Sequence, residues 1–141
     1  MRRTERLSVS SEEGAPPRLE LDGRPTEARA PGIILEAAFE AEEGLLAFFT
    51  HDSPFDESLE IVLLDHSLRT VDRLAVPSHG VLALFSDPEP RGPRALAFRY
   101  FGGEPWMVEV SERPRWRLPF TLPPGVEAPL GPGKRLTLLQ P

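Results

Sequence analysis

Three histidines, His51, His66 and His79, are the residues of this sequence best suited to acid–base or metal chemistry. Two of them have a carboxylate as a neighbour, in His51-Asp52 and Asp65-His66, a pairing that metal sites and acid–base pairs use. No His-x-His or His-x-x-x-His spacing occurs, and both pairs fall where strands are predicted to end. We therefore interpret the histidines as turn residues, and we predict no catalytic residue and no metal ligand.

Motifs for other kinds of catalysis fail on spacing or on residue type. A serine nucleophile would be expected in Gly-x-Ser-x-Gly, which is absent, and adjacent side chains such as Ser78 and His79 point apart on an extended segment. The segment Gly131–Arg135 is similar to a phosphate-binding loop, but Arg135 stands where serine or threonine would hold magnesium. We interpret this segment as a loop leading into the last strand, and we predict no cofactor.

Composition excludes several further classes of site. The chain has no cysteine, which excludes disulfides, thiolate catalysis and cysteine-ligated zinc. The basic start, Met1–Arg6, is followed by no apolar stretch of the kind that a secretory signal needs, and the longest apolar run, Gly44–Phe49, is far shorter than a membrane span. We expect a cytoplasmic protein, and the use of 15 arginines against one lysine is typical of GC-rich bacterial coding.

Charge is distributed unevenly along the chain. Residues 36–65 hold nine carboxylates and no lysine or arginine, and residues 1–90 carry a formal net charge of −10 against +4 for residues 91–141. An acidic surface disfavours nucleic acid and favours a basic protein partner. Two interpretations stay open: the region is a partner-binding face, or the two halves neutralise one another within the fold. The candidate face consists of Glu42, Glu43, Asp52, Asp56, Glu57 and Glu60, which we expect to be exposed.

Aromatic and arginine residues are interleaved towards the C-terminal end, as they are in proteins that bind single-stranded nucleic acid. We interpret Phe98, Tyr100 and Trp106 as core residues, with arginine on the outward positions. The segment Arg115-Trp116-Arg117 does not fit this simple alternation, which makes Trp116 a candidate exposed aromatic. The sequence thus predicts no nucleic-acid partner and singles out one tryptophan.

Short strands must position all of these residues. From Ile33 onward, short apolar runs recur every 10–14 residues, and turn residues bound each of them. This pattern of short apolar runs and turns predicts an all-β chain that forms an antiparallel β-sandwich or small barrel of about eight to nine short strands. Within Leu59–Asp65, alternation places Leu59, Ile61 and Leu63 inward and Glu60 outward. Residues 87–93 contain too much proline for a regular element.

The clearest element is a hairpin over Arg94–Ser111, which turns at Gly102-Gly103-Glu104. The register that we expect pairs Tyr100 with Trp106, Phe98 with Val108 and Leu96 with Val110. All six side chains then share one face, and Arg99 lies diagonal to Glu109 on the other.

Residues 1–31 are polar and rich in turn residues, and we predict an N-terminal extension that is partly disordered or wraps the domain at 32–141. Two short alternations, Leu7/Val9 and Leu19/Leu21, are candidate strands within it. Because little apolar surface offsets the entropy of ordering, we expect limited proteolysis to leave a stable fragment that starts near Pro31.

Two functions of different classes are compatible with these observations. The first is a non-catalytic protein-interaction module, in one version an inhibitor or immunity-type protein, that uses the acidic region 36–65 against a basic partner. The alternative is a small-molecule or carbohydrate binder, or an enzyme, with a pocket near His51, Asp52 and Trp116. Convergent polar groups in a concave site would favour the alternative.

Overall fold

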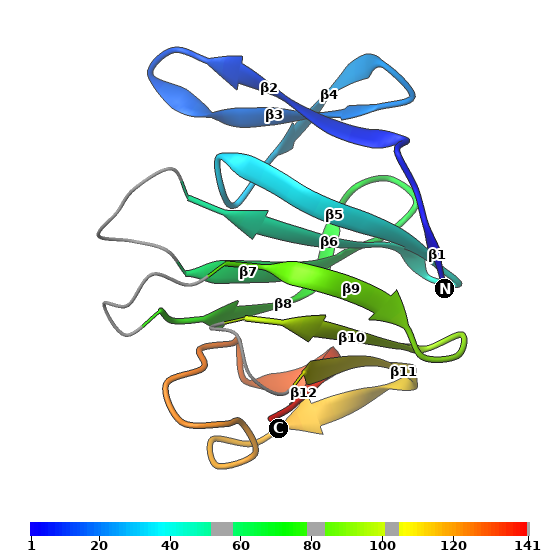
Figure 1. Cartoon of the computed structure of the whole chain (residues 1–141), viewed down its shortest axis with the longest axis vertical. Helices are drawn as coiled ribbons and strands as arrows, with labels where there is room; N and C mark the ends of the chain where they lie inside the picture. Colours follow the sequence, from blue (N-terminus) through cyan, green and yellow to red (C-terminus); the bar gives the residue numbers. More distant parts are fainter. Residues whose placement is uncertain (52–57, 79–83, 101–104, 141) are drawn as a thin grey trace.

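The computed structural model of the chain describes residues 1–51, 58–78, 84–100 and 105–140, and the regular elements of these residues are all strands (Figure 1). Twelve strands form three antiparallel sheets, which confirms the predicted all-β, sandwich-like fold. Eight of the strands lie within 32–141, and four lie within 1–31.

The three sheets have simple strand orders. The central sheet, β1-β5-β6-β7-β8, consists of β1 (Arg2–Arg3), β5 (Ile34–Ala41), β6 (Gly44–Thr50), β7 (Leu59–Leu64) and β8 (Thr70–Val76). The outer sheet, β12-β11-β10-β9, consists of β9 (Ser86–Pro90), β10 (Ala95–Arg99), β11 (Trp106–Arg117) and β12 (Gly131–Leu139). The N-terminal sheet, β2-β3-β4, consists of β2 (Leu7–Glu12), β3 (Ala15–Leu21) and β4 (Arg24–Arg29).

The central sheet is buried on both faces. Phe48 of β6 belongs to the core shared with the outer sheet, whereas its neighbours Ala47 and Phe49 belong to the core shared with the N-terminal sheet. Strands covered on both faces favour continuous apolar runs, which explains the sequences of β6 and β7. The predicted inward face of Leu59, Ile61 and Leu63 is confirmed, but the expectation of a solvent-facing second side is wrong, because Val62 and Leu64 are buried against the N-terminal sheet.

The N-terminal sheet is a meander with two-residue turns. Asp22 and Gly23 connect β3 to β4, with φ angles of 53° and 78°, the left-handed values that a hairpin turn of this length requires. The apolar alternations of this segment lie in β2 and β3, and Leu7 and Leu19 are buried. Together with Ala30 they pack on the central sheet, so residues 1–31 contribute part of the core.

The β10–β11 hairpin forms with its apolar residues on one face, but in a register that differs from the expected one. Phe98 pairs with Trp106, and Leu96 with Val108, a shift of two residues. The connection is longer than expected, because Tyr100 already lies outside β10; the turn predicted at 102–104 falls outside the described residues. A shift by two keeps every side chain on its face. The predicted Arg99–Glu109 diagonal is wrong, since Glu109 pairs with Ala95.

Two expectations for proline-rich segments were also wrong. Residues Ser86–Pro90 form β9, although 87–93 were expected to be irregular. β9 is an edge strand of the outer sheet, and an edge strand accommodates proline because one side of it needs no donors. The sequence also predicts a separate edge strand at Arg115–Phe120, because Pro114 and Pro119 cannot donate ladder hydrogen bonds. Arg115–Arg117 are instead the end of β11.

Candidate functional site

The set of β11 side chains that face the core changes in the middle of the strand, from even-numbered to odd-numbered residues. We call this the change of phase. Up to Val110 the fully buried residues of β11 are even-numbered, whereas the buried residues after it, Ser111 and Arg117, are odd-numbered. Without this change, Trp116 would point into the core and Arg117 into solvent. With the change, an arginine is buried and a tryptophan is exposed, which is the reverse of what the hydrophobic effect favours.

A β-bulge produces the change of phase. Between Val110 and Arg115, β11 advances five residues while its partner β12 advances two, from Leu136 to Lys134. β11 therefore contains three extra residues, and an odd number moves the following side chains to the opposite face. Bulges of this kind re-aim side chains, and they are over-represented beside functional sites.

At the end of β11, the buried Arg117 forms an ion pair with Asp72 of the central sheet. The Arg117 guanidinium donates two hydrogen bonds, of 2.8 and 2.6 Å, to the two carboxylate oxygens of Asp72 in β8, and both residues are buried. Asp72 Oδ2 also accepts the backbone N–H groups of Arg135 and Leu136, at 2.9 and 2.8 Å. Arg117 donates further to the carbonyls of Pro129 and Leu136. The pair thus satisfies both backbone groups of Leu136 in the edge strand β12 and links the central and outer sheets.

The pKa of Asp72 lies below its ordinary value. Burial by itself raises the pKa of this carboxyl, but hydrogen bonds from Arg117 and from the backbone of Leu136 and Arg135 together lower it by more. Asp72 is therefore charged in the folded protein at neutral pH. We interpret the pair as the contact that holds the end of β11 in place and so keeps the neighbouring Trp116 side chain exposed.

The exposed end of the segment is apolar and cationic. Trp116 is 71% exposed, Leu118 57% and Phe120 98%. We use the name Trp116 surface for Trp116, Leu118 and Phe120 with the cations Arg113 and Arg115 of the same stretch of chain and Lys134 of β12. Lys134 lies opposite Arg115 in the β11–β12 ladder. Within the described part of the chain, none of the three cations forms an ion pair.

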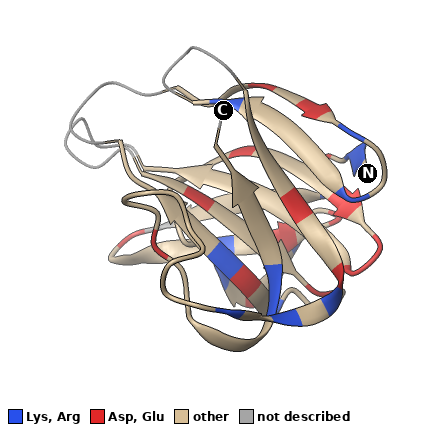
Figure 2. Ribbon diagram, turned by 90° about the horizontal axis from the view of Figure 1, so that it is seen from below, with Lys and Arg blue, Asp and Glu red and all other residues tan. Residues whose placement is uncertain are grey.

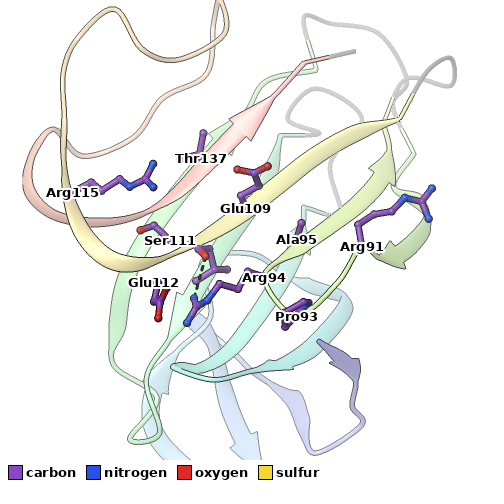
Figure 3. Close-up of a pocket in the computed structure, with 10 residues that line it drawn as sticks. Arg91, Pro93, Arg94, Ala95, Glu109, Ser111, Glu112, Arg115 and Thr137 are labelled. Carbon is purple, nitrogen blue, oxygen red and sulfur yellow. Dashed lines mark hydrogen bonds between the residues drawn. The ribbon is translucent and has the colours of Figure 1, made fainter.

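Two hollows flank this surface. The smaller, of about 200 Å³, has a wall of aromatic, cationic and apolar side chains that includes Arg115, Trp116, Thr121, Leu122 and Lys134. The larger, of about 360 Å³, lies over the bulge, and Figure 3 shows Arg91 and Arg115 at its opposite ends with Glu109 between them. Its charges are of both signs and do not converge on one point.

Arginines from both halves of the chain pair with carboxylates of the acidic region. Figure 2 shows basic and acidic segments interspersed along the ribbon. Glu42 and Glu43 form ion pairs with Arg94 at 2.9 and 2.7 Å, and Glu43 lies 3.7 Å from Arg135. Glu40 is bound by Arg2 and Arg6. The contacts of Glu42 and Glu43 join residues 1–90 to residues 91–141, and they favour the interpretation that the two halves neutralise one another within the fold.

The remaining residues of the predicted acidic face lie in different surroundings. Glu60 is 3.8 Å from His51, and its side chain is only 17% exposed, so the expectation of an exposed Glu60 is wrong. Asp52, Asp56 and Glu57 fall outside the described residues. The Glu42 side chain is 83% exposed, whereas that of Glu43 is only 15% exposed, so the expectation of an exposed Glu43 is wrong. A partner-binding role for these residues stays a prediction.

We predict that Glu43→Lys destabilises the protein by about 2 kcal/mol, because it removes charge-assisted hydrogen bonding and places a third cation beside Arg94 and Arg135. The matched control is Glu42→Lys, the same change one residue earlier on an exposed side chain, which should cost less than about 1 kcal/mol. Urea unfolding of both variants is the measurement. Equal midpoints would show that Glu43 is not held by these arginines.

The pocket predicted near His51, Asp52 and Trp116 stays a prediction, and the described residues place His51 and Trp116 in different sheets. His51 follows β6 of the central sheet, whereas Trp116 lies in β11 of the outer sheet and faces solvent. Glu60, beside His51, lines a separate hollow of about 520 Å³ together with Arg73 and Glu127. Asp52 is outside the described residues, so the structure describes only His51 and Trp116 of the three residues predicted for a ligand-binding or active site.

The described residues hold no further candidate for a metal site or a membrane-spanning helix. Within residues 1–51, 58–78, 84–100 and 105–140, no three histidine or carboxylate side chains gather as possible metal ligands. No helical segment of these residues has the length and apolar character that crossing a bilayer requires. No protein-family model, no curated protein and no solved structure matches the chain. The candidate site therefore rests on geometry alone.

Proposed function

We propose that this chain is a non-catalytic protein-interaction module and that the Trp116 surface is its contact site. The observation that carries the proposal is the change of phase in β11, which exposes Trp116 and buries Arg117. A departure from the hydrophobic pattern that the fold alone does not require is expected at a functional position. Trp116 and Phe120 are also of the residue types that dominate protein interfaces.

The arrangement has the parts of a small interface. Large apolar side chains at its centre supply burial, and the flanking cations Arg113, Arg115 and Lys134 supply a polar rim. The bidentate Asp72–Arg117 pair fixes the strand beneath, so that little conformational entropy would be lost on binding. An interface of this design needs no cofactor.

We predict that Trp116→Ala combined with Phe120→Ala abolishes capture of the partner when the immobilised full-length chain is incubated with lysate of its own cells. The stability should change by no more than about 0.5 kcal/mol, since both side chains are exposed. The matched control is Ile33→Ala, which removes an exposed apolar side chain elsewhere on the protein. Equal capture by the double variant and the wild type would remove the Trp116 surface from this proposal.

The acidic region is the competing surface for a protein partner. If it binds a basic partner, capture should weaken as salt shortens the Debye length from roughly 10 Å at 0.1 M to 3 Å at 1 M. Reversing Glu42, Asp56 and Glu57 to lysine, with Glu43 left intact to preserve its ion pairs, tests this in the same assay. Loss of capture in this variant, together with full capture by the Trp116→Ala/Phe120→Ala variant, would favour the acidic face.

The alternative of a small-molecule or carbohydrate site, or an enzyme, is supported by the 520 Å³ hollow beside Glu60, which has the size of a ligand pocket. We predict that His51→Ala leaves partner capture unchanged, because His51 follows β6 of the central sheet, whereas Trp116 lies in β11 of the outer sheet. His66→Ala and His79→Ala should also leave partner capture unchanged. Loss of cellular function at one of the three, with an unchanged melting temperature, would favour an enzyme.

A further inference from the structure

We infer that the Trp116 surface recognises an acidic, unfolded or extended protein segment that carries one large apolar residue. This inference rests on the proposed function and adds the chemistry of the partner. Two properties of the surface lead to it, namely three cations that form no ion pair with the described residues and the size of the hollow beside Trp116.

The charge of the surface is distinctive for this protein. The chain as a whole has a formal net charge of −6, and many of its arginines bind carboxylates of the same chain, as Arg94 binds Glu42 and Glu43. Arg113, Arg115 and Lys134 are different, because they form no ion pair with the described residues; Glu109 and Glu112 line the neighbouring hollow with Arg115 but do not bind it. Carboxylates from another molecule would complement them, and complementary charge gives specificity and faster association.

The hollow beside Trp116 sets the size of what can enter it. Its volume of about 200 Å³ is below the 300–1,000 Å³ of pockets that hold drug-sized ligands, and it suits a single inserted side chain. Trp116 and Leu122 supply apolar wall, and Arg115 and Lys134 lie at the same hollow. An apolar anchor with acidic neighbours along its own chain matches this combination.

Other polyanions fit these observations less well. A nucleic-acid site needs a groove of many cations along a backbone, and here three cations stand on a protein of net negative charge. An anionic membrane would likewise be repelled by the rest of the chain, and its flat surface has no single group to fill the hollow. Both are included as outcomes of the test below.

The test is selection of a random 12-residue display library on the immobilised full-length protein at 0.1 M salt. We expect enriched peptides to have a net negative charge and one Phe, Leu, Ile or Trp, and to bind at least tenfold more weakly to the Trp116→Ala variant. Reversing the surface charge, with Arg115→Glu and Lys134→Glu, should invert the selection towards basic peptides. The matched control, Arg24→Glu and Arg29→Glu on the exposed strand β4, should leave the selection acidic.

Each result bears on the inference. Enrichment of neutral or basic peptides by the wild type, or no enrichment, overturns it, as does an acidic selection that persists in the charge-reversed variant. Binding of a 12-residue oligo-thymidylate or of vesicles with 30% phosphatidylserine, lost with Trp116→Ala, would overturn it in favour of a nucleic acid or a membrane. The proposed function fails separately, if the lysate partner is still captured after Trp116 and Phe120 are removed.

Discussion

Replacing Asp72 by alanine is expected to lower the free energy of unfolding by about 3–5 kcal/mol, because the change leaves the buried Arg117 guanidinium without a counter-ion. The backbone N–H groups of Arg135 and Leu136 would also lose their acceptor. For a chain of this length the loss corresponds to roughly 10 °C in melting temperature. Urea and thermal unfolding measure it directly.

Two controls separate the effect of burial from the effect of pairing. Asp22→Asn removes the charge from an ion pair with Arg6 that is also bidentate, at 2.9 and 3.0 Å, but exposed. Asparagine tolerates the left-handed φ of Asp22, so the urea midpoint should be nearly unchanged. Removing both buried charges, with Asp72→Leu and Arg117→Met, should give a protein more stable than Asp72→Ala. A small effect of Asp72→Ala, similar to that of Asp22→Asn, would contradict the role assigned to the pair.

The same pair predicts a dependence of stability on pH. The pKa of Asp72 is lower in the folded protein than its ordinary value of 3.8, so its contribution is present above that value and is lost as the pH falls through the folded pKa. Wild type should therefore lose more stability between pH 7 and pH 3 than Asp72→Asn, which has no proton to bind at this position. A constant difference between the two proteins across this range would show that Asp72 does not titrate with unfolding.

Removing residues 1–31 is expected to abolish soluble, cooperative folding of the rest of the chain. The truncation would uncover one whole face of the central sheet, including Phe49, Val62 and Leu64, which the N-terminal sheet covers in the intact protein. Exposed apolar area of this kind leads to aggregation or dye binding. This expectation replaces the stable fragment from Pro31 that the sequence suggested. Gel filtration and binding of a hydrophobic dye are the measurements.

A single substitution tests the same contact without removing any backbone. Leu19→Ala in β3, at a fully buried position, should cost about 2–4 kcal/mol in the intact chain. Val9→Ala in β2, at a partly buried position packed against the same core, should cost less. A truncated chain that stays monomeric and unfolds cooperatively would show that the N-terminal sheet is not needed to cover the central one.

The sequence was sufficient for the class of the fold, because antiparallel strands separated by turn residues leave a strong local pattern. The sequence did not predict how the three sheets stack on one another. The runs in β6 and β7 have the signature of strands buried on both sides, but nothing local identifies what covers the second face. The Asp22-Gly23 dipeptide, a strong hairpin signal between Leu21 and Arg24, would have indicated that the N-terminal segment is ordered.

The candidate site could be predicted only in part. Trp116 stood out because its alternation with arginine conflicts with a core strand, and its side chain is exposed. The bulge that causes this depends on how β11 pairs with β12, which no local pattern fixes. The partnership of Asp72 with Arg117 joins residues 45 positions apart and had no sequence signal beyond an aspartate within a strand.

The position of the Asp72–Arg117 pair also has a consequence for the order in which the protein folds. The hairpins of the N-terminal sheet are local and can form soon after their residues leave the ribosome, but β12 and the pair that caps its edge need almost the whole chain. Until then the apolar side chains of β8 that face the outer sheet lack their cover, as does the free edge of the growing sandwich. A ribosome stalled before Arg117 would therefore carry a nascent chain that binds chaperones, whereas one stalled beyond Leu139 with the chain fully extruded would not.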